Sequence, residues 1–169
     1  MPLLGQHSAS GSKEPVGGIQ AFHVMRFFRH LIRCVDRGPM IVVDASCAVD
    51  ILIGSERGHA ARSLIERDGD PVAPHLLDAE VAGVIRQQRL LGSIDATTAS
   101  QAIDDLSSWP IERFGHSGLL ARAWELRDNV RTWDAFYVAL AEVLDAPLLT
   151  ADIRLTRANG VRCDFELIA

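Results

Sequence analysis

The sequence predicts a three-layer α/β/α fold around a central parallel sheet. Short β-branched or apolar runs alternate along the chain with longer segments of helical periodicity. The helical segments are long enough to carry the chain from one parallel strand to the next. With 169 residues, of which 48% are hydrophobic and 23% charged, the chain has the size and composition of one globular domain with a sizeable core.

The first half of this alternation begins at Met40. Residues 41–44 are a β-branched run that predicts a buried strand, and residues 71–73 predict a weaker second strand. Helices are expected over residues 46–53 and 58–67, and a long helix over 75–91 is ended by Gly92. The expected apolar face of that long helix comprises Leu76, Leu77, Val81, Val84 and Ile85.

The second half repeats the pattern. Asp95 is expected to cap a helix whose apolar face comprises Ala99, Ala102, Ile103 and Leu106. Residues 111–114 predict a third strand, and Leu119, Leu120, Ala123 and Trp124 mark a further helix. The strongest helical pattern covers residues 133–144, and strands are expected over 147–150 and 165–168.

Residues 1–39 are expected to be a leader outside the folded core. Residues 1–18 are rich in Gly, Pro and Ser, whereas residues 19–35 can form a basic amphipathic helix. That helix would either bind a membrane surface or partner, or belong to an extension upstream of a start at Met25 or Met40. The second interpretation is favoured, because Met40 directly precedes a strong strand. The predicted domain therefore covers residues 40–169.

Composition excludes several kinds of chemistry. Sixteen of the basic residues are arginines and Lys13 is the single lysine, which disfavours mechanisms that need a lysine in the folded body. Residues 1–39 carry a net charge of +3 and the remainder −8. An acidic body argues against simple electrostatic wrapping of nucleic acid. It leaves open an acidic site that recruits metal ions, which then bind phosphate.

The cysteines and the hydropathy pattern bear on the cellular compartment. Cys34, Cys47 and Cys163 are too few and too far apart for a disulfide framework or a CxxC zinc half-site. Free thiols fit a reducing cytoplasm. No uninterrupted apolar run reaches the roughly 20 residues that a membrane span needs, and the amino-terminal segment is interrupted by arginines, unlike a signal peptide. We therefore expect a cytoplasmic protein without a membrane partner.

Acidic residues are placed where a parallel sheet binds ligands. Asp44 and Asp152 directly follow two predicted strands, although helix capping would explain either one alone. Glu80 lies on the apolar face of its helix, where an ionised carboxylate needs an ion-pair partner, such as Arg86 or Arg154, or a metal ion. Asp134 opens the strongest helix, where it could simply favour the helix dipole.

Together, these acids favour a metal site. Carboxylates that meet at one end of a sheet repel one another unless cations lie between them. Oxygen ligands without His or Cys select Mg²⁺ or Mn²⁺ rather than zinc, and one or two such ions can activate a phosphodiester for hydrolysis. Ser46 and Thr150 could add hydroxyl contacts or make local turn and cap bonds, and the latter is the preferred interpretation.

The acids lie in four characteristic segments: Val42-Val43-Asp44-Ala45-Ser46, Leu77-Asp78-Ala79-Glu80-Val81, Trp133-Asp134-Ala135-Phe136-Tyr137-Val138-Ala139-Leu140-Ala141 and Leu149-Thr150-Ala151-Asp152. Through these segments, about 130 residues from Met40 onward resemble a PIN-domain ribonuclease of the VapC toxin type. The family usually has tyrosine where Trp133 stands. Carried over position by position, the resemblance implies that Asp44, Glu80, Asp134 and Asp152 are the catalytic, metal-binding acids.

The same resemblance implies the PIN-like form of the predicted fold and an activity. The protein would be a Mg²⁺- or Mn²⁺-dependent endoribonuclease, the toxin of a toxin–antitoxin pair, leaving a 5′-phosphate and a 3′-hydroxyl. Its implied partners are an RNA substrate, a cognate VapB-like antitoxin that blocks the acidic site, and a second copy in a homodimer. Arg86, Arg131 and Arg154 are candidates for phosphate contacts or solvated ion pairs. His75 and His116 are expected in capping or surface roles.

Other classes of protein are less consistent with the residues. A haloacid-dehalogenase-like phosphatase needs a second Asp where Ser46 stands, and a receiver domain needs a lysine late in the fold. A P-loop or dinucleotide-binding domain needs a glycine-rich turn after the first strand. A catalytically silent PIN-like module that binds RNA or protein, and a metal-dependent DNA nuclease, remain as alternatives.

Overall fold

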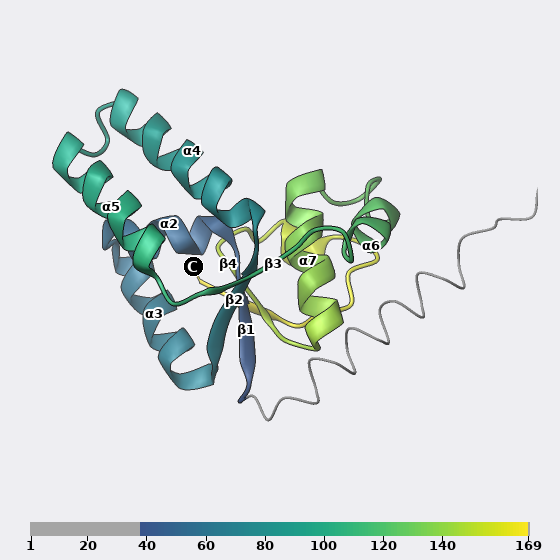
Figure 1. Cartoon of the computed structure of the whole chain (residues 1–169). Helices are drawn as coiled ribbons and strands as arrows, with labels where there is room; N and C mark the ends of the chain where they lie inside the picture. The colour runs from purple at the N-terminus through teal and green to yellow at the C-terminus, as the bar shows by residue number, and fades with distance from the viewer. Residues whose placement is uncertain (1–37, 169) are drawn as a thin grey trace, which may run out of the picture.

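The structure is a computed structural model that describes residues 38–168, and nearly all of the expected leader over 1–39 lies outside the described residues. A five-stranded sheet runs through the middle of the described chain, and its strand pairings are parallel. Helices cover both faces of this sheet (Figure 1). The predicted three-layer α/β/α fold is therefore confirmed.

The order of the strands contains one reversal. The strands are β1 (Met40–Val43), β2 (Asp70–Pro74), β3 (Glu112–Phe114), β4 (Leu148–Thr150) and β5 (Phe165–Leu167). Their order across the sheet is β3-β2-β1-β4-β5, so the chain first proceeds from β1 to one edge and then returns to the other side of β1. The reversal falls between β1 and β4, and open parallel sheets bind ligands beyond the carboxyl ends of the strands at such a point.

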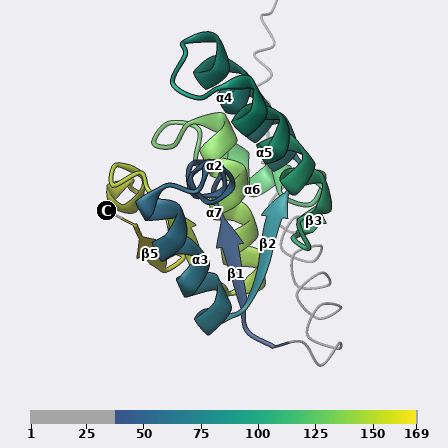
Figure 2. The same ribbon diagram turned by 90° about the vertical axis from the view of Figure 1, so that its left-hand side faces the viewer.

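Two groups of helices enclose the sheet. One face carries α2 (Ala45–Ile53), α3 (Glu56–Asp68), α4 (Leu76–Leu90) and α5 (Ala96–Ser108), and the other carries α6 (Leu120–Glu125) and α7 (Thr132–Leu144). A short 3₁₀ helix, η1 (Leu155–Arg157), follows β4. Figure 2 shows α4 and α5 continuing past the arrowheads of β1 and β2, so this pair projects beyond the carboxyl edge of the sheet. In the described part of the chain, no helix has both the length and the apolar character to cross a membrane.

The core is centred on β1, β4 and the middle of α7. Ile41, Val42 and Val43 are completely buried, and the sequence from Ala135 to Ala141 is buried along its whole length. In the other helices, the buried face is narrower than the apolar face predicted from the sequence. Val84, Ile103, Leu120 and Trp124 are exposed, because each lies beside, and not on, the buried side of its helix.

The junction of α2 and α3 provides a test of this packing. Ser55 caps α3 by accepting a hydrogen bond from the Gly58 amide at 3.0 Å, which brings Gly58 against the backbone of α2. A methyl group on Gly58 would collide with the carbonyl oxygen of Asp50. Gly83, in α4, has open space at the same position.

We predict that Gly58→Ala lowers the free energy of unfolding by about 2 kcal/mol or more, because neither backbone segment can yield to the added methyl group. Gly83→Ala is the control and should raise it by about 0.5–1 kcal/mol, as expected for alanine in an exposed helix. Urea unfolding of the two variants measures both changes. Equal stability of both variants would contradict the close packing of α2 against α3.

Candidate active site

The register between β1 and β4 positions Asp44. Val42 pairs with Leu148 and Val43 with Leu149, so Asp44 comes to lie beside Thr150 at the carboxyl edge. The Thr150 hydroxyl donates a hydrogen bond to Asp44 Oδ2 at 2.6 Å, and the Ser46 hydroxyl donates to the same oxygen at 2.9 Å. Although Asp44 is the N-cap residue of α2, its side chain caps no amide of that helix. The capping interpretation is therefore wrong for Asp44, and both hydroxyls instead orient its carboxylate.

Asp152 follows β4 and has a local partner. Its Oδ1 accepts a hydrogen bond from the Arg154 amide at 2.8 Å, and its two oxygens contact the Arg154 guanidinium at 3.0 and 2.9 Å. These bonds hold the pKa of the Asp152 carboxyl below its usual range. The Arg154 side chain is 72% exposed, so the pair is a weak one that can exchange for other partners.

Glu80 is held by a tyrosine from the opposite face of the sheet. Its side chain is half-buried in the second turn of α4, between the fully buried Leu77 and Val81. The Tyr137 hydroxyl, from the buried face of α7, donates a hydrogen bond to Glu80 Oε2 at 2.6 Å. The observed partner is therefore Tyr137, and not Arg86 or Arg154 as considered from the sequence.

The beginning of α4 is fixed by side chains from around β3. His116 Nε2 accepts a hydrogen bond from the Leu76 amide at 3.1 Å, so His116 caps α4, while His75 is exposed. The Arg113 guanidinium pairs with Asp78 in the first turn of α4 at 2.9 Å. His75 thus has the expected surface position, whereas His116 caps α4 and not the helix that follows it in the chain. These contacts fix the helix that presents Glu80 to the site.

Asp134 has few direct contacts. It lies in the first turn of α7, is half-buried, and among the described residues it accepts no hydrogen bond and forms no direct ion pair. Arg131 and Arg154 are close enough to interact with it electrostatically. A half-buried carboxylate without a donor beside it is typical of a group with a ligand to bind.

The carboxylates lie close enough to shift one another's pKa. Burial raises the pKa of Glu80; Asp44 and Asp134 raise it further, and the bond from Tyr137 opposes them. Burial also raises the pKa of Asp134, with Asp44 and Asp152 raising it further against two arginines. All the acids predicted from the sequence are thus brought together at the reversal point of the sheet.

A pocket of about 160 Å³ opens beside these acids. It lies between the beginning of α7 and the chain after β4, and both acids and cations line it. The charged residues of its wall are Arg131, Asp134, Asp152 and Arg154. The pocket can therefore accept a group that interacts with cations and carboxylates at once, as a phosphate beside a divalent cation does.

The donor set fits a hard cation such as Mg²⁺ or Mn²⁺. Its potential ligands are carboxylates, and among the described residues Asp44 Oδ1 accepts no hydrogen bond. As placed, no three His, Cys, Asp or Glu side chains of residues 38–168 converge closely enough to enclose an ion. Like charges keep these carboxylates apart, so holding an ion between them requires their side chains to turn inward.

Sequence analysis did not identify Tyr137 and His116 as residues that support the site. Tyr137 is the chain's single tyrosine and lies three residues after Asp134, on neighbouring turns of one helix. That spacing was a signal available in the sequence. His116 caps a helix 40 residues earlier in the chain, which no local pattern reveals.

Fold and site define the class of protein. A three-layer α/β/α domain carries neighbouring carboxylates at the reversal point of its parallel sheet, and a family model described as "PIN domain" matches residues 41–161. Three relatives share 36–41% identity with this chain over most of its length. They are Ribonuclease VapC1 of Mycobacterium tuberculosis (41% identical, covering 75% of this chain and 96% of the relative), Ribonuclease VapC3 of the same organism (40%, 70% and 86%) and VapC ribonuclease Mb0985 of Mycobacterium bovis (36%, 76% and 98%).

The chain therefore belongs to the PIN-domain family, among proteins of the VapC type. Among solved structures, it is similar to VapBC2 from Rickettsia felis bound to a DNA fragment from their promoter, with a TM-score of 0.57 and 14% identity. That match covers 77% of this chain and 99% of the other and supports the fold.

We predict that Glu80→Gln and Asp134→Asn each raise the melting temperature by a few degrees near pH 7 in a chelating buffer. Folding raises the pKa of both carboxyls, so their ionised forms destabilise the folded protein above that pKa. This loss of stability disappears as pH falls through the raised pKa and the carboxyls become protonated. The variants should then melt at the same temperature as wild type. Thermal unfolding from about pH 7.5 to about pH 4 measures this trend. Variants less stable than wild type near pH 7 would contradict it.

We predict that Tyr137→Phe leaves the fold intact but lowers the free energy of unfolding by about 1.5–3 kcal/mol, the usual contribution of a hydrogen bond to a charged group. Because the Tyr137 hydroxyl lowers the pKa of Glu80, its removal should raise that pKa further. Urea unfolding measures the first effect and carboxyl NMR titration the second. An unchanged Glu80 pKa would contradict the role assigned to Tyr137.

Proposed function

We propose that the protein is a Mg²⁺- or Mn²⁺-dependent endoribonuclease and the toxin of a toxin–antitoxin pair. The observation that carries this proposal is the group of facing carboxylates at the reversal point of the sheet. The ribonuclease names of relatives with 36–41% identity support RNA as the substrate. The residues that would hold the metal are Asp44, Glu80, Asp134 and Asp152.

The protein's own side chains would prepare the site in distinct ways. Thr150 and Ser46 orient Asp44, and Tyr137 orients Glu80. A bound divalent ion supplies Lewis-acid activation of the phosphodiester and of the attacking water. The cysteine nearest the site supplies no nucleophile, because burial raises the pKa of the Cys47 thiol to about 12.

Arg131 and Arg154 would bind the RNA backbone. Both line the pocket that also contains Asp134 and Asp152, so a phosphate there lies next to the carboxylates. No side chain caps the amino end of α7, and backbone amides at such an end favour an anion. On phosphate binding, Arg154 can transfer its hydrogen bonds from Asp152 to the phosphate, leaving Asp152 available for metal.

The proposed partners are an RNA substrate, a cognate VapB-like antitoxin and a second copy of the chain. The similar solved structure is named VapBC2, which supports pairing with an antitoxin. An antitoxin arginine among the carboxylates would satisfy the charges that the metal otherwise neutralises. Cys47 and Cys163 are free thiols, which supports function in the reducing cytoplasm.

We predict that the full chain cleaves RNA to 5′-phosphate and 3′-hydroxyl ends with Mg²⁺ or Mn²⁺, and that a chelator stops cleavage. Asp44→Asn, Glu80→Gln, Asp134→Asn and Asp152→Asn should each reduce the cleavage rate by about 100-fold or more, because each removes a charged metal ligand. Gel analysis of end-labelled RNA measures both effects.

The exposed Asp104→Asn is the matched control and should retain full activity. Cleavage that persists in chelator, or full activity in two or more of the site variants, would overturn the metal assignment. A preference for DNA of the same sequence would replace the ribonuclease with a DNA nuclease. A folded protein that binds RNA without cleaving it would indicate the silent module.

A further inference from the structure

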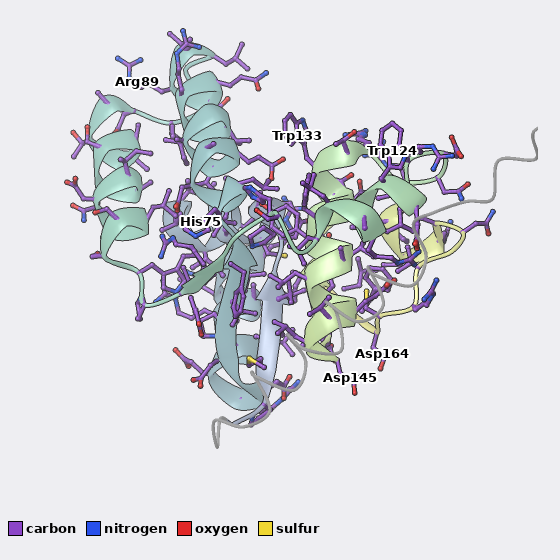
Figure 3. The ribbon with its side chains drawn as sticks, turned by 45° about the vertical axis from the view of Figure 1, so that its right-hand side comes forward. His75, Arg89, Trp124, Trp133, Asp145 and Asp164 are labelled. Atoms are coloured by element: carbon purple, nitrogen blue, oxygen red, sulfur yellow. The ribbon has the colours of Figure 1, made fainter. Side chains whose placement is uncertain are left out.

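Trp133 exposes a large aromatic surface at the edge of the site. Its side chain is 60% exposed, although tryptophans are usually well covered in folded proteins. Figure 3 shows the indole projecting from the amino end of α7, away from the helices and into solvent. This end of α7 is also the carboxyl edge of the sheet, where the acidic residues lie. Packing of the core therefore does not explain an indole at this position.

The first turn of α7 brings different chemical groups together. Arg131 is its N-cap residue, Trp133 and Asp134 follow, and Arg131 and Asp134 line the same pocket. One helical turn thus presents a cation, an exposed aromatic ring and a carboxylate of the proposed metal site. A nucleotide has a phosphate and an aromatic base that match the first two groups, and single-stranded RNA exposes its bases to stacking.

We propose that Trp133 is a stacking platform for one base of single-stranded RNA, next to the phosphate that the carboxylates cleave. This inference rests on the proposed function and adds a residue that positions the substrate. Stacking on an indole tolerates every base, so Trp133 strengthens binding and fixes the register of the strand without reading its sequence. RNA is favoured over a protein partner because the same turn supplies a cation for the phosphate and a carboxylate of the proposed metal site.

Trp124 provides a matched comparison on the neighbouring helix. It is 69% exposed, as open to solvent as Trp133, and it comes from α6 (Figure 3). The Arg127 guanidinium lies over its ring, 5.1 Å from the centroid, so one face of this indole already has a cation as partner. Neither indole lines the pocket beside the acids, but Trp133 directly precedes Asp134 of its wall, whereas Trp124 lies on another helix, α6. If any exposed tryptophan could affect RNA binding, replacing Trp124 would weaken binding as much as replacing Trp133.

The experiment compares full-length wild type, Trp133→Ala, Trp133→Phe and Trp124→Ala. Cleavage of a single-stranded RNA is measured with Mg²⁺, and binding of the same labelled RNA is measured by fluorescence anisotropy in chelator. Trp133→Ala should raise KM and weaken binding by about 5- to 150-fold with kcat within about twofold of wild type. Trp133→Phe should retain most of the affinity, and Trp124→Ala should behave as wild type.

An RNA with an abasic ribose at one position makes the test specific. Once the cleavage site is mapped, abasic residues are placed in turn on either side of it. At one of these positions, wild type should lose affinity to the level of Trp133→Ala, and Trp133→Ala should lose no more. Equal losses at every position in both proteins would overturn the stacking contact.

The outcomes separate this inference from the proposed function. Normal cleavage and unchanged binding by Trp133→Ala would overturn the stacking role and leave the ribonuclease intact. If wild type binds RNA without cleaving it and Trp133→Ala loses that binding, the nuclease is refuted and the stacking contact is supported. Normal RNA binding by Trp133→Ala, combined with failure to assemble with the co-expressed antitoxin, would assign the indole to a protein interface and overturn the inference.

Discussion

Repulsion among carboxylates that lie close together is the constraint on which the rest of this structure depends. Asp44, Glu80 and Asp134 come from different elements at the reversal point of the sheet, where burial and the charge of Asp44 raise the pKa of the Glu80 and Asp134 carboxyls. A core that minimised its free energy alone would separate them or pair each with an arginine. The fold instead fixes two of them with neutral donors: the Thr150 hydroxyl binds Asp44 and the Tyr137 hydroxyl binds Glu80. Neutral donors of this kind orient a carboxylate without neutralising it, which keeps its charge for a cation.

The scaffold therefore separates rigid support from exchangeable contacts. Tyr137 is fully buried in the best-packed helix, and Thr150 is buried at the end of a central strand, so neither can follow a ligand. Arg154 is exposed, and its pair with Asp152 can be exchanged at little cost. Asp134 and Trp133 share the open first turn of α7. The inner side of the site is thus fixed, while the side that would receive RNA and metal can rearrange.

The sheet and the strongest helix could be predicted from local periodicity. Strand ends and helix positions pointed to Asp44, Asp152, Glu80 and Asp134 one by one, and the family resemblance joined them into one proposed site. Asp44 and Asp152 were identified as candidates because each directly follows a predicted strand. The bond between Tyr137 and Glu80 joins residues 57 apart, and the His116 cap joins residues 40 apart. Such contacts depend on how elements pack in space and leave no local pattern. The exposure of Val84 and Ile103 was missed for the same reason, since apolar character alone does not show which side of a helix finds a neighbour.

Direct titration of Mn²⁺ into the full-length protein, followed by electron paramagnetic resonance, tests most directly whether the carboxylates form a metal site. Protons compete with the cation for Glu80 and Asp134, whose pKa values are raised. We expect saturable binding near about pH 7.5 that weakens steadily toward about pH 5.5, and markedly weaker binding by Asp44→Asn at either pH. Binding by Asp44→Asn equal to that of wild type, or no saturable binding by folded wild type, would contradict the account.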